Sequence, residues 1–209
     1  MRFDRSSSTV RAAVMRGLTL VTLLAISLTG RAQARPVTVF GLDPGQTSAM
    51  ELGFNYTYFH ANAPPAQCGC FSMNGGGGTL VMNMPRGVSL VADLEGARAS
   101  KINGTSQNVS IFNYMFGPRY SYRTPSRFTP YGEVLVGGAE ELSNYAFVQN
   151  RQALAVSGGG GVSRVLNRHL AWNMVEVDYV YSRLPNAVND HQNDLRVSTG
   201  IVFRFGLRQ

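Results

Sequence analysis

Residues 195–205 alternate strictly between two faces. One face carries apolar side chains and one threonine: Leu195, Val197, Thr199, Ile201, Phe203 and Phe205. The opposite face carries Arg196 and Arg204 among mostly small residues. A period of two residues indicates a β-strand, and these eleven residues match the length with which a tilted strand crosses a bilayer. The segment therefore suits the wall of a transmembrane β-barrel, which has lipid outside and polar side chains inside.

The N-terminal residues form a predicted export signal. Four arginines precede an apolar run at 18–28, and small residues follow at Ala32 and Ala34. This order is typical of a signal peptide with an A-x-A cleavage site, so we expect residues 1–34 to be removed after Ala34. A membrane-spanning helix is disfavoured because the run of eleven residues is too short. Met15 is a second candidate start.

Removing the leader changes the charge balance. The chain has 19 basic and 12 acidic residues, of which 14 and 11 remain, so the net charge falls from +7 to +3. The remaining arginines are scattered, so we expect no nucleic-acid partner. No long apolar run remains after residue 34, so a spanning part must be a closed barrel. We expect residues 35–47 to form a periplasmic N-terminal segment and residues 48–209 to form one barrel domain.

Alternation predicts an all-β chain that folds as an eight-stranded antiparallel up-and-down transmembrane β-barrel. The predicted strands lie at about 48–60, 75–85, 87–99, 108–121, 128–140, 152–163, 170–182 and 194–206. Short connections alternate with mostly longer polar loops at 61–74, 100–107, 141–151 and 183–193. This pattern is typical of outer-membrane barrels. An even number of strands places both termini in the periplasm and the longer loops outside.

Charged residues gather on the predicted inner face. They are Glu51, Asp93, Glu95, Arg119, Glu133, Glu176, Asp178, Arg196 and Arg204. A soluble barrel or sandwich also alternates, but those folds turn their apolar face inward. With the charged face inside, a soluble barrel would expose its aromatic wall to water. An eight-stranded barrel encloses only enough space for side chains, and unpaired buried ions are costly. We therefore expect an internal network of ion pairs.

Antiparallel closure suggests partners within this network. Glu51 falls level with Arg204. Arg196, nearer the outer end, falls level with Asp178. Arg119 can reach acids on the third or fifth strand. We expect the network to fill the lumen as a plug, with a gated ion path as the alternative. Since six acids face three arginines, some acids are expected to be protonated or in contact with water.

Several segments, taken in order, resemble a known family. They are the segments at 116–123, 129–138, 158–161, 175–179 and 200–206. Together they resemble the OmpA-like outer-membrane β-barrel domain family, in particular its small eight-stranded single-domain members. Phe203 and Phe205 resemble its closing-strand signal. The resemblance implies a bacterial outer-membrane protein embedded in lipid after insertion by the barrel-assembly machinery, and we expect a monomer. No segment resembles the peptidoglycan-binding domain of OmpA, so no cell-wall tether is expected.

Cysteine and glycine patterns suggest no cofactor. Cys68 and Cys70 flank Gly69 in the first predicted outer loop. An oxidising compartment favours a local disulfide, with free or intermolecular thiols as the alternative, and a metal site would need more ligands. The glycine runs at 75–78 and 158–161 lack the lysine and the strand-to-helix setting of a phosphate-binding loop. We expect them to permit tight curvature.

The three histidines do not indicate catalysis. His60 and His191 fall near the outer rim and His169 at the opposite end, and none has a serine or carboxylate partner that the sequence makes evident. We therefore expect a non-enzymatic protein that contributes to envelope integrity. One alternative is a narrow pore for ions or small solutes. The other is an adhesin-like binder that acts through its outer loops on an unknown ligand.

Overall fold

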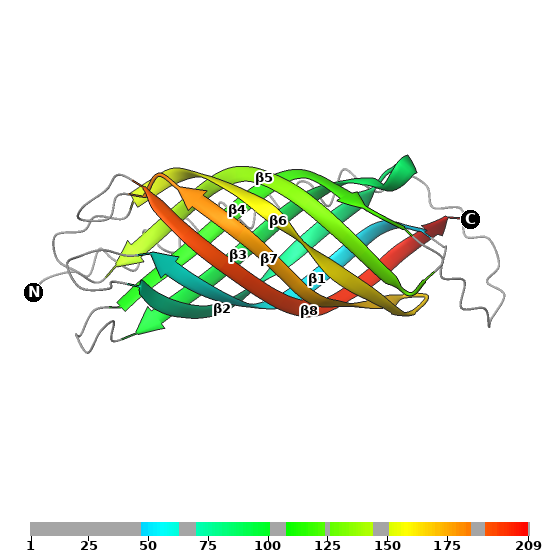
Figure 1. Cartoon of the computed structure of the whole chain (residues 1–209), viewed down its shortest axis with the longest axis horizontal. Helices are drawn as coiled ribbons and strands as arrows, with labels where there is room; N and C mark the ends of the chain where they lie inside the picture. The colour runs from blue at the N-terminus through cyan, green and yellow to red at the C-terminus, as the bar shows by residue number, and fades with distance from the viewer. Residues whose placement is uncertain are drawn as a thin grey trace, which may run out of the picture. The chain divides into compact units, whose positions relative to one another are not determined.

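The computed structural model describes residues 47–62, 70–100, 108–123, 126–143, 151–184 and 191–208. Within them, eight antiparallel strands close into one barrel in chain order (Figure 1). The strands are β1 (Thr47–Asn62), β2 (Cys70–Asn83), β3 (Val88–Ser100), β4 (Asn108–Ser121), β5 (Phe128–Ser143), β6 (Arg151–Asn167), β7 (Leu170–Ser182) and β8 (Gln192–Arg208). Pairing of β1 with β8 closes the barrel. The predicted fold class is confirmed. Within the described residues, no helix has the length and apolar character needed to cross a membrane.

The largest difference from the predicted strand bounds is in β2. This strand begins at Cys70, where it pairs with Asn62, and so extends into the first predicted outer loop. Polar and glycine residues there show no alternation of apolar side chains, so the sequence does not indicate this part of the strand. Its backbone nevertheless pairs with β1. Cys68 lies outside the described residues, as do Ala32 and Ala34, so the disulfide and the cleavage site stay predictions.

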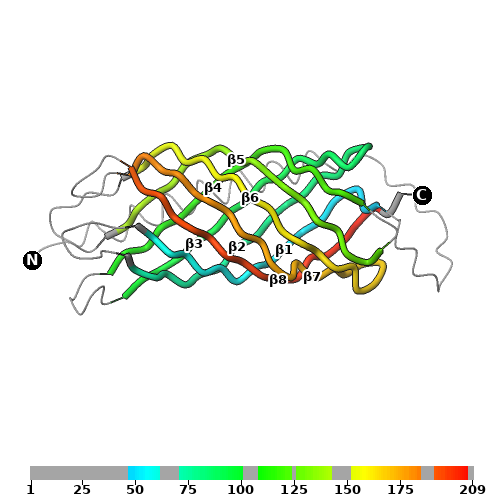
Figure 2. Tube along the Cα trace, viewed as in Figure 1, coloured from blue at the N-terminus to red at the C-terminus, as the bar shows by residue number. Residues whose placement is uncertain are grey.

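The two ends of the barrel differ in their connections. β1 begins and β8 ends at the same end, where Thr47 is level with Arg208. The short β2–β3, β4–β5 and β6–β7 connections also lie there, including the 3-10 turn η1 (Pro85–Gly87). We call this the turn end, and the opposite end, where β1 ends and β8 begins, the loop end. Figure 2 shows that the strands run obliquely between these two ends.

Exposed large apolar side chains stand on the outer face of every strand except β2. They include Phe54 and Phe116, which are 56% and 60% exposed. Phe54 also contacts Phe203 edge to face, with ring centroids 6.2 Å apart. Tyrosines stand on the same face near the loop end, where Tyr58 and Tyr179 hydrogen-bond Ser72 and Asn193. An exposed apolar surface of this kind suits contact with hydrocarbon rather than with water.

A bulge in β7 reverses the alternation of its side chains. The register against β8 shifts between Asn173 and Glu176. Strict alternation would place Trp172 on the same inward face as Glu176. In the structure Trp172 faces outward, with 39% of its surface exposed, whereas Glu176 is buried in the lumen. The simple two-residue pattern was therefore wrong for Trp172, because a β-bulge adds a residue without pairing it.

Candidate functional site

The structure places all nine predicted network residues on inward-facing positions of the barrel. Seven of them are buried, and Glu51 and Arg119 are partly buried. Eight ion pairs connect members of the set. The residues divide into a large group around Arg196 and Arg119 and a separate Glu51–Arg204 pair, whose residues are level across the β1–β8 ladder.

Arg196 on β8 is the centre of the larger group. Its side chain is 0% exposed. Nη1 donates hydrogen bonds to Asp93 Oδ2 at 2.6 Å and Glu95 Oε2 at 2.7 Å. Nε and Nη2 donate to Asp178 Oδ2 at 3.0 and 2.8 Å, and Nη2 lies 3.4 Å from Glu176 Oε1. The guanidinium therefore connects β8 to both β3 and β7. Sequence register predicted the Asp178 contact but not the reach across the lumen to β3.

Arg119 on β4 holds the next group of polar side chains. Its Nε donates to Glu133 Oε2 at 2.6 Å, and its Nη2 lies 3.7 Å from Glu176 Oε2. The guanidinium also lies 4.1 Å from the centroid of the Tyr131 ring. The Tyr131 hydroxyl donates to Glu176 Oε2 and lies 2.9 Å from Asn173 Oδ1. Sequence analysis did not select Tyr131, although it shares the inward face of β5 with Glu133.

Three of the acids have a spacing that also suits a divalent cation. Glu133, Glu176 and Asp178 each place one oxygen within 4.8 Å of the others. However, Arg196 Nη2 already lies 4.0, 3.4 and 2.8 Å from oxygens of these three residues. The guanidinium thus occupies the position that a cation would take. The acids form the acceptor shell of an arginine.

Two inward glycines make room for acids of this group. A Cβ atom on Gly77 of β2 would lie 2.6 Å from Glu95 Cγ. A Cβ atom on Gly159 of β6 would lie 2.2 Å from Asp178 Oδ1. Both contacts are far shorter than real Cβ atoms permit. These two glycines therefore supply space for carboxylates, and the expected role of the glycine runs in strand curvature stays a prediction.

Apolar side chains close the lumen toward the loop end. One buried cluster comprises Phe59, Ala61, Met73, Ala97, Ala99, Ile111 and Val180. These residues stand near the loop ends of β1, β2, β3, β4 and β7. A second cluster includes Val91, Met115 and Leu135, which share inward faces with the charged residues. The lumen is therefore a mixed core rather than a purely polar one, and the sequence carried that signal in Val91 and Met115.

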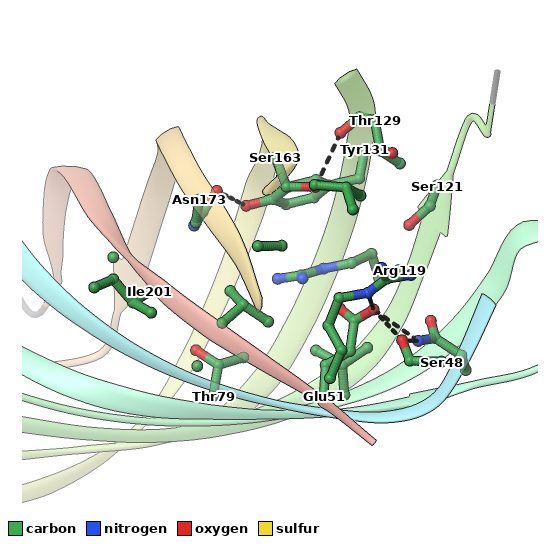
Figure 3. A pocket seen from close by; sticks show the side chains of 18 of the residues that line it. Ser48, Glu51, Thr79, Arg119, Ser121, Thr129, Tyr131, Ser163, Asn173 and Ile201 are labelled. Atoms are coloured by element: carbon green, nitrogen blue, oxygen red, sulfur yellow. Dashed lines mark hydrogen bonds and ion pairs between the residues drawn. The ribbon is translucent and has the colours of Figure 1, made fainter. Parts of the chain in front are cut away.

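A cavity of about 80 Å³ lies in the turn half of the lumen. Figure 3 shows Tyr131 and Asn173 on one side of it, Ser48 and Glu51 on the opposite side, and Arg119 between them. Its size is sufficient for several water molecules. Glu51 Oε1 accepts hydrogen bonds from Ser48 Oγ at 2.5 Å and Asn83 Nδ2 at 3.2 Å, and Arg204 Nε lies 3.7 Å from it.

Arg123, just beyond β4, borders the same cavity and was not selected from the sequence. Its Nη1 donates to Thr47 Oγ1 at 3.0 Å and its Nη2 to Asn83 Oδ1 at 2.9 Å. Burial lowers the pKa of this guanidinium; Glu51 opposes the shift and the positive charge of Arg204 adds to it. Arg123 falls in a predicted turn, where alternation gives no information about direction.

Comparison with known proteins identifies the fold alone. No family model matches the chain, and no curated protein matches it. Among solved structures, Neisserial surface protein A is 13% identical, with a TM-score of 0.58 over 76% of this chain and 98% of that one. Ail of Yersinia pestis is 11% identical, with a TM-score of 0.54 over 76% and 100%. OprG of Pseudomonas aeruginosa is 15% identical, with a TM-score of 0.50 over 79% and 100%. The fold is that of the small outer-membrane β-barrels.

Proposed function

We propose that this protein is a non-enzymatic, non-conducting barrel of the bacterial outer membrane that contributes to the integrity of the envelope. The observation that carries the proposal is Arg196. Its side chain is fully buried and bonds acids of β3 and β7 across the lumen, while the outer face of the same barrel is apolar. Together these features describe a lipid-embedded cylinder with a filled interior.

The interior supports a plug rather than a pore. An ion crossing the barrel would have to displace Arg196 from four carboxylates to which it donates hydrogen bonds. It would then meet the apolar cluster that includes Phe59 and Met73. Both steps remove water from a charge, which costs several kcal/mol when no partner replaces it.

The remaining parts of the proposal follow from the topology. We infer that the turn end faces the periplasm, that residues 1–34 are cleaved after Ala34, and that the barrel-assembly machinery inserts the chain as a monomer. N-terminal sequencing of protein from the outer-membrane fraction tests the cleavage site. A first residue other than Arg35 would contradict it.

Conductance is the decisive test of the plug. Protein purified from membranes in detergent should show a heat-modifiable gel shift, which reports a folded barrel. In a planar bilayer we expect no single-channel steps from the wild type. Arg204→Ala serves as a matched variant, because it removes an arginine of the turn half while Arg196 stays in place, and it should also be silent. Steps from the folded wild type would contradict the plug.

One observation favours a narrow pore as the second candidate. The cavity beside Glu51 and Arg204 already opens part of the turn half. A pore would have to continue past Arg196, so wild-type conductance that increases in Arg196→Gln would support it. The adhesin-like alternative depends on outer loops that lie mainly outside the described residues, and it stays a prediction.

A further inference from the structure

Arginines gather at the turn end of the barrel. Each of the three short connections or its flanking strand ends carries at least one, as does the last part of β8: Arg86, Arg123, Arg127, Arg164, Arg168 and Arg204. Among the described residues within four positions of that end, Glu51 is the only acid. The loop end is different. Outside the lumenal group, its described charges are of both signs: Arg98 and Arg183 stand with Glu140, Glu141 and Asp194.

Arg164 stands on the outer face at this basic end. It is level with Phe128 on β5 and Trp172 on β7. Its guanidinium carbon lies 5.5 Å from the centroid of the Phe128 ring, and both Phe128 and Trp172 are exposed on the outer face. Arg127 is exposed and adjacent, since its carbonyl oxygen accepts a hydrogen bond from the Val165 backbone nitrogen. The side chains of Arg164, Phe128 and Trp172 thus lie together on the outer face, with the backbone of Arg127 beside them. We call these four residues the patch.

This patch has positive charge without a carboxylate beside it. In the part of the chain that the structure describes, no acid lies within 4.0 Å of Arg127 or Arg164. A charge on the lipid-facing surface is costly at the bilayer midplane and tolerable near the interface. There, a guanidinium is suited to bind phosphate through two parallel hydrogen bonds, and aromatic rings rest between headgroups and acyl chains.

We propose that Arg127, Arg164, Phe128 and Trp172 form a binding site for the headgroup of an anionic phospholipid. The proposal rests on the proposed function, because it requires the apolar face to lie in a bilayer. The phosphate contacts the two guanidinium groups, and the acyl chains contact the two rings. An anionic lipid is favoured over a zwitterionic one. A zwitterionic headgroup would bring a positive charge to a patch that already holds two arginines.

Trp172 makes the site directly observable, because it is the single tryptophan of the chain. Protein purified from membranes is reconstituted into phosphatidylcholine vesicles that contain either brominated phosphatidylglycerol or brominated phosphatidylcholine. Bromine quenches tryptophan fluorescence on contact. We expect phosphatidylglycerol to associate more strongly with the site, by about fivefold for each arginine.

Variants then assign the preference to the patch. Arg164→Gln should reduce the preference about fivefold, the double variant Arg127→Gln/Arg164→Gln should abolish it, and Arg164→Lys should retain most of it. Arg98→Gln is the matched control at the loop end and should leave it unchanged. The heat-modifiable gel shift verifies that each variant folds. If the double variant does not fold, the lipid preference of Arg164→Gln alone tests the site.

The possible failures are distinguishable. Equal quenching by the two brominated lipids in the wild type, or an unchanged preference in a folded Arg164→Gln variant, overturns the lipid site and leaves the barrel in its membrane. Absence of quenching by either lipid means that Trp172 does not face acyl chains. That result overturns the proposed function as well.

Discussion

The loop half and the turn half of the lumen hold the same residue types in different surroundings. In the loop half, Arg196 is fully buried and donates hydrogen bonds to acids of β3 and β7, with apolar side chains beyond it. In the turn half, Arg204 Nε lies 3.7 Å from Glu51 Oε1, beside a cavity with room for water. A buried ion with fixed partners cannot be replaced by solvent, whereas a pair beside water can exchange one partner for another. Access of water, rather than the presence of an ion pair, should therefore decide how much each arginine contributes.

The largest expected effect follows removal of the Arg196 charge. Arg196→Gln leaves the carboxylates of Asp93, Glu95 and Asp178 without their shared cation in a closed space. We expect a loss of about 3–5 kcal/mol in the free energy of unfolding, or failure to fold. Urea unfolding in detergent, followed by the gel shift, measures it. A loss below about 1 kcal/mol would show that the closed half does not depend on its arginine.

The second-largest loss of stability is expected at only one of two neighbouring glycines of β6. Gly159 faces inward, and a Cβ there would lie 2.2 Å from Asp178 Oδ1 and 2.2 Å from the Val177 carbonyl oxygen. Gly158 has nothing within 4 Å of the same position. Gly159→Ala should therefore destabilise the barrel by about 1–3 kcal/mol, while Gly158→Ala should change stability by less than about 0.5 kcal/mol.

Unfolding of both variants under the same conditions checks this comparison. Equal losses would show that the glycines act mainly through strand curvature, as the sequence suggested. A loss confined to Gly159→Ala would show that the inward position has no room for a Cβ atom beside Asp178 and the Val177 carbonyl group.

The architecture could be predicted well because successive residues of a barrel strand face alternately outward and into the lumen. Phe54, Ile201 and Phe203 face outward as expected, and Glu51, Arg196 and Arg204 face inward. In a regular antiparallel ladder, the register between neighbours follows from the positions of the turns. The Glu51–Arg204 and Asp178–Arg196 pairs could therefore be predicted from the sequence.

Features that depend on irregularity or on side-chain reach could not be predicted in this way. The outward position of Trp172 results from a bulge, which changes the parity of β7 without a local sequence signal. The contact of Arg196 with Asp93 and Glu95 crosses the lumen, so strand pairing does not specify it. Tyr131 is a strand tyrosine like those on the outer face. Only its position on the same face as Glu133 indicates that it points inward.

Tyr131 lies at the boundary between the two halves and should give an intermediate effect. Its hydroxyl donates to Glu176 and contacts Asn173, and its ring lies under Arg119. Tyr131→Phe keeps the ring and removes the hydroxyl, so we expect a loss of about 1–2 kcal/mol from the weakened hydrogen bonding of Glu176. Urea unfolding measures the loss. Tyr114→Phe is a control of the same chemistry on the outer face, where the side chain is 41% exposed.

Arg204→Gln should have the smallest effect of the four. Its ion pair with Glu51 is long, and Glu51 Oε1 keeps hydrogen bonds from Ser48 and Asn83 after the arginine is lost. Water in the adjacent cavity can then solvate the carboxylate. We expect a loss of about 1 kcal/mol or less, measured in the same unfolding series as Arg196→Gln. If the two arginine variants lose the same free energy, water does not enter the turn half. The contrast between a closed and a hydrated half would then have to be abandoned. Access of solvent is the difference from which unequal losses are expected for the two Arg→Gln substitutions.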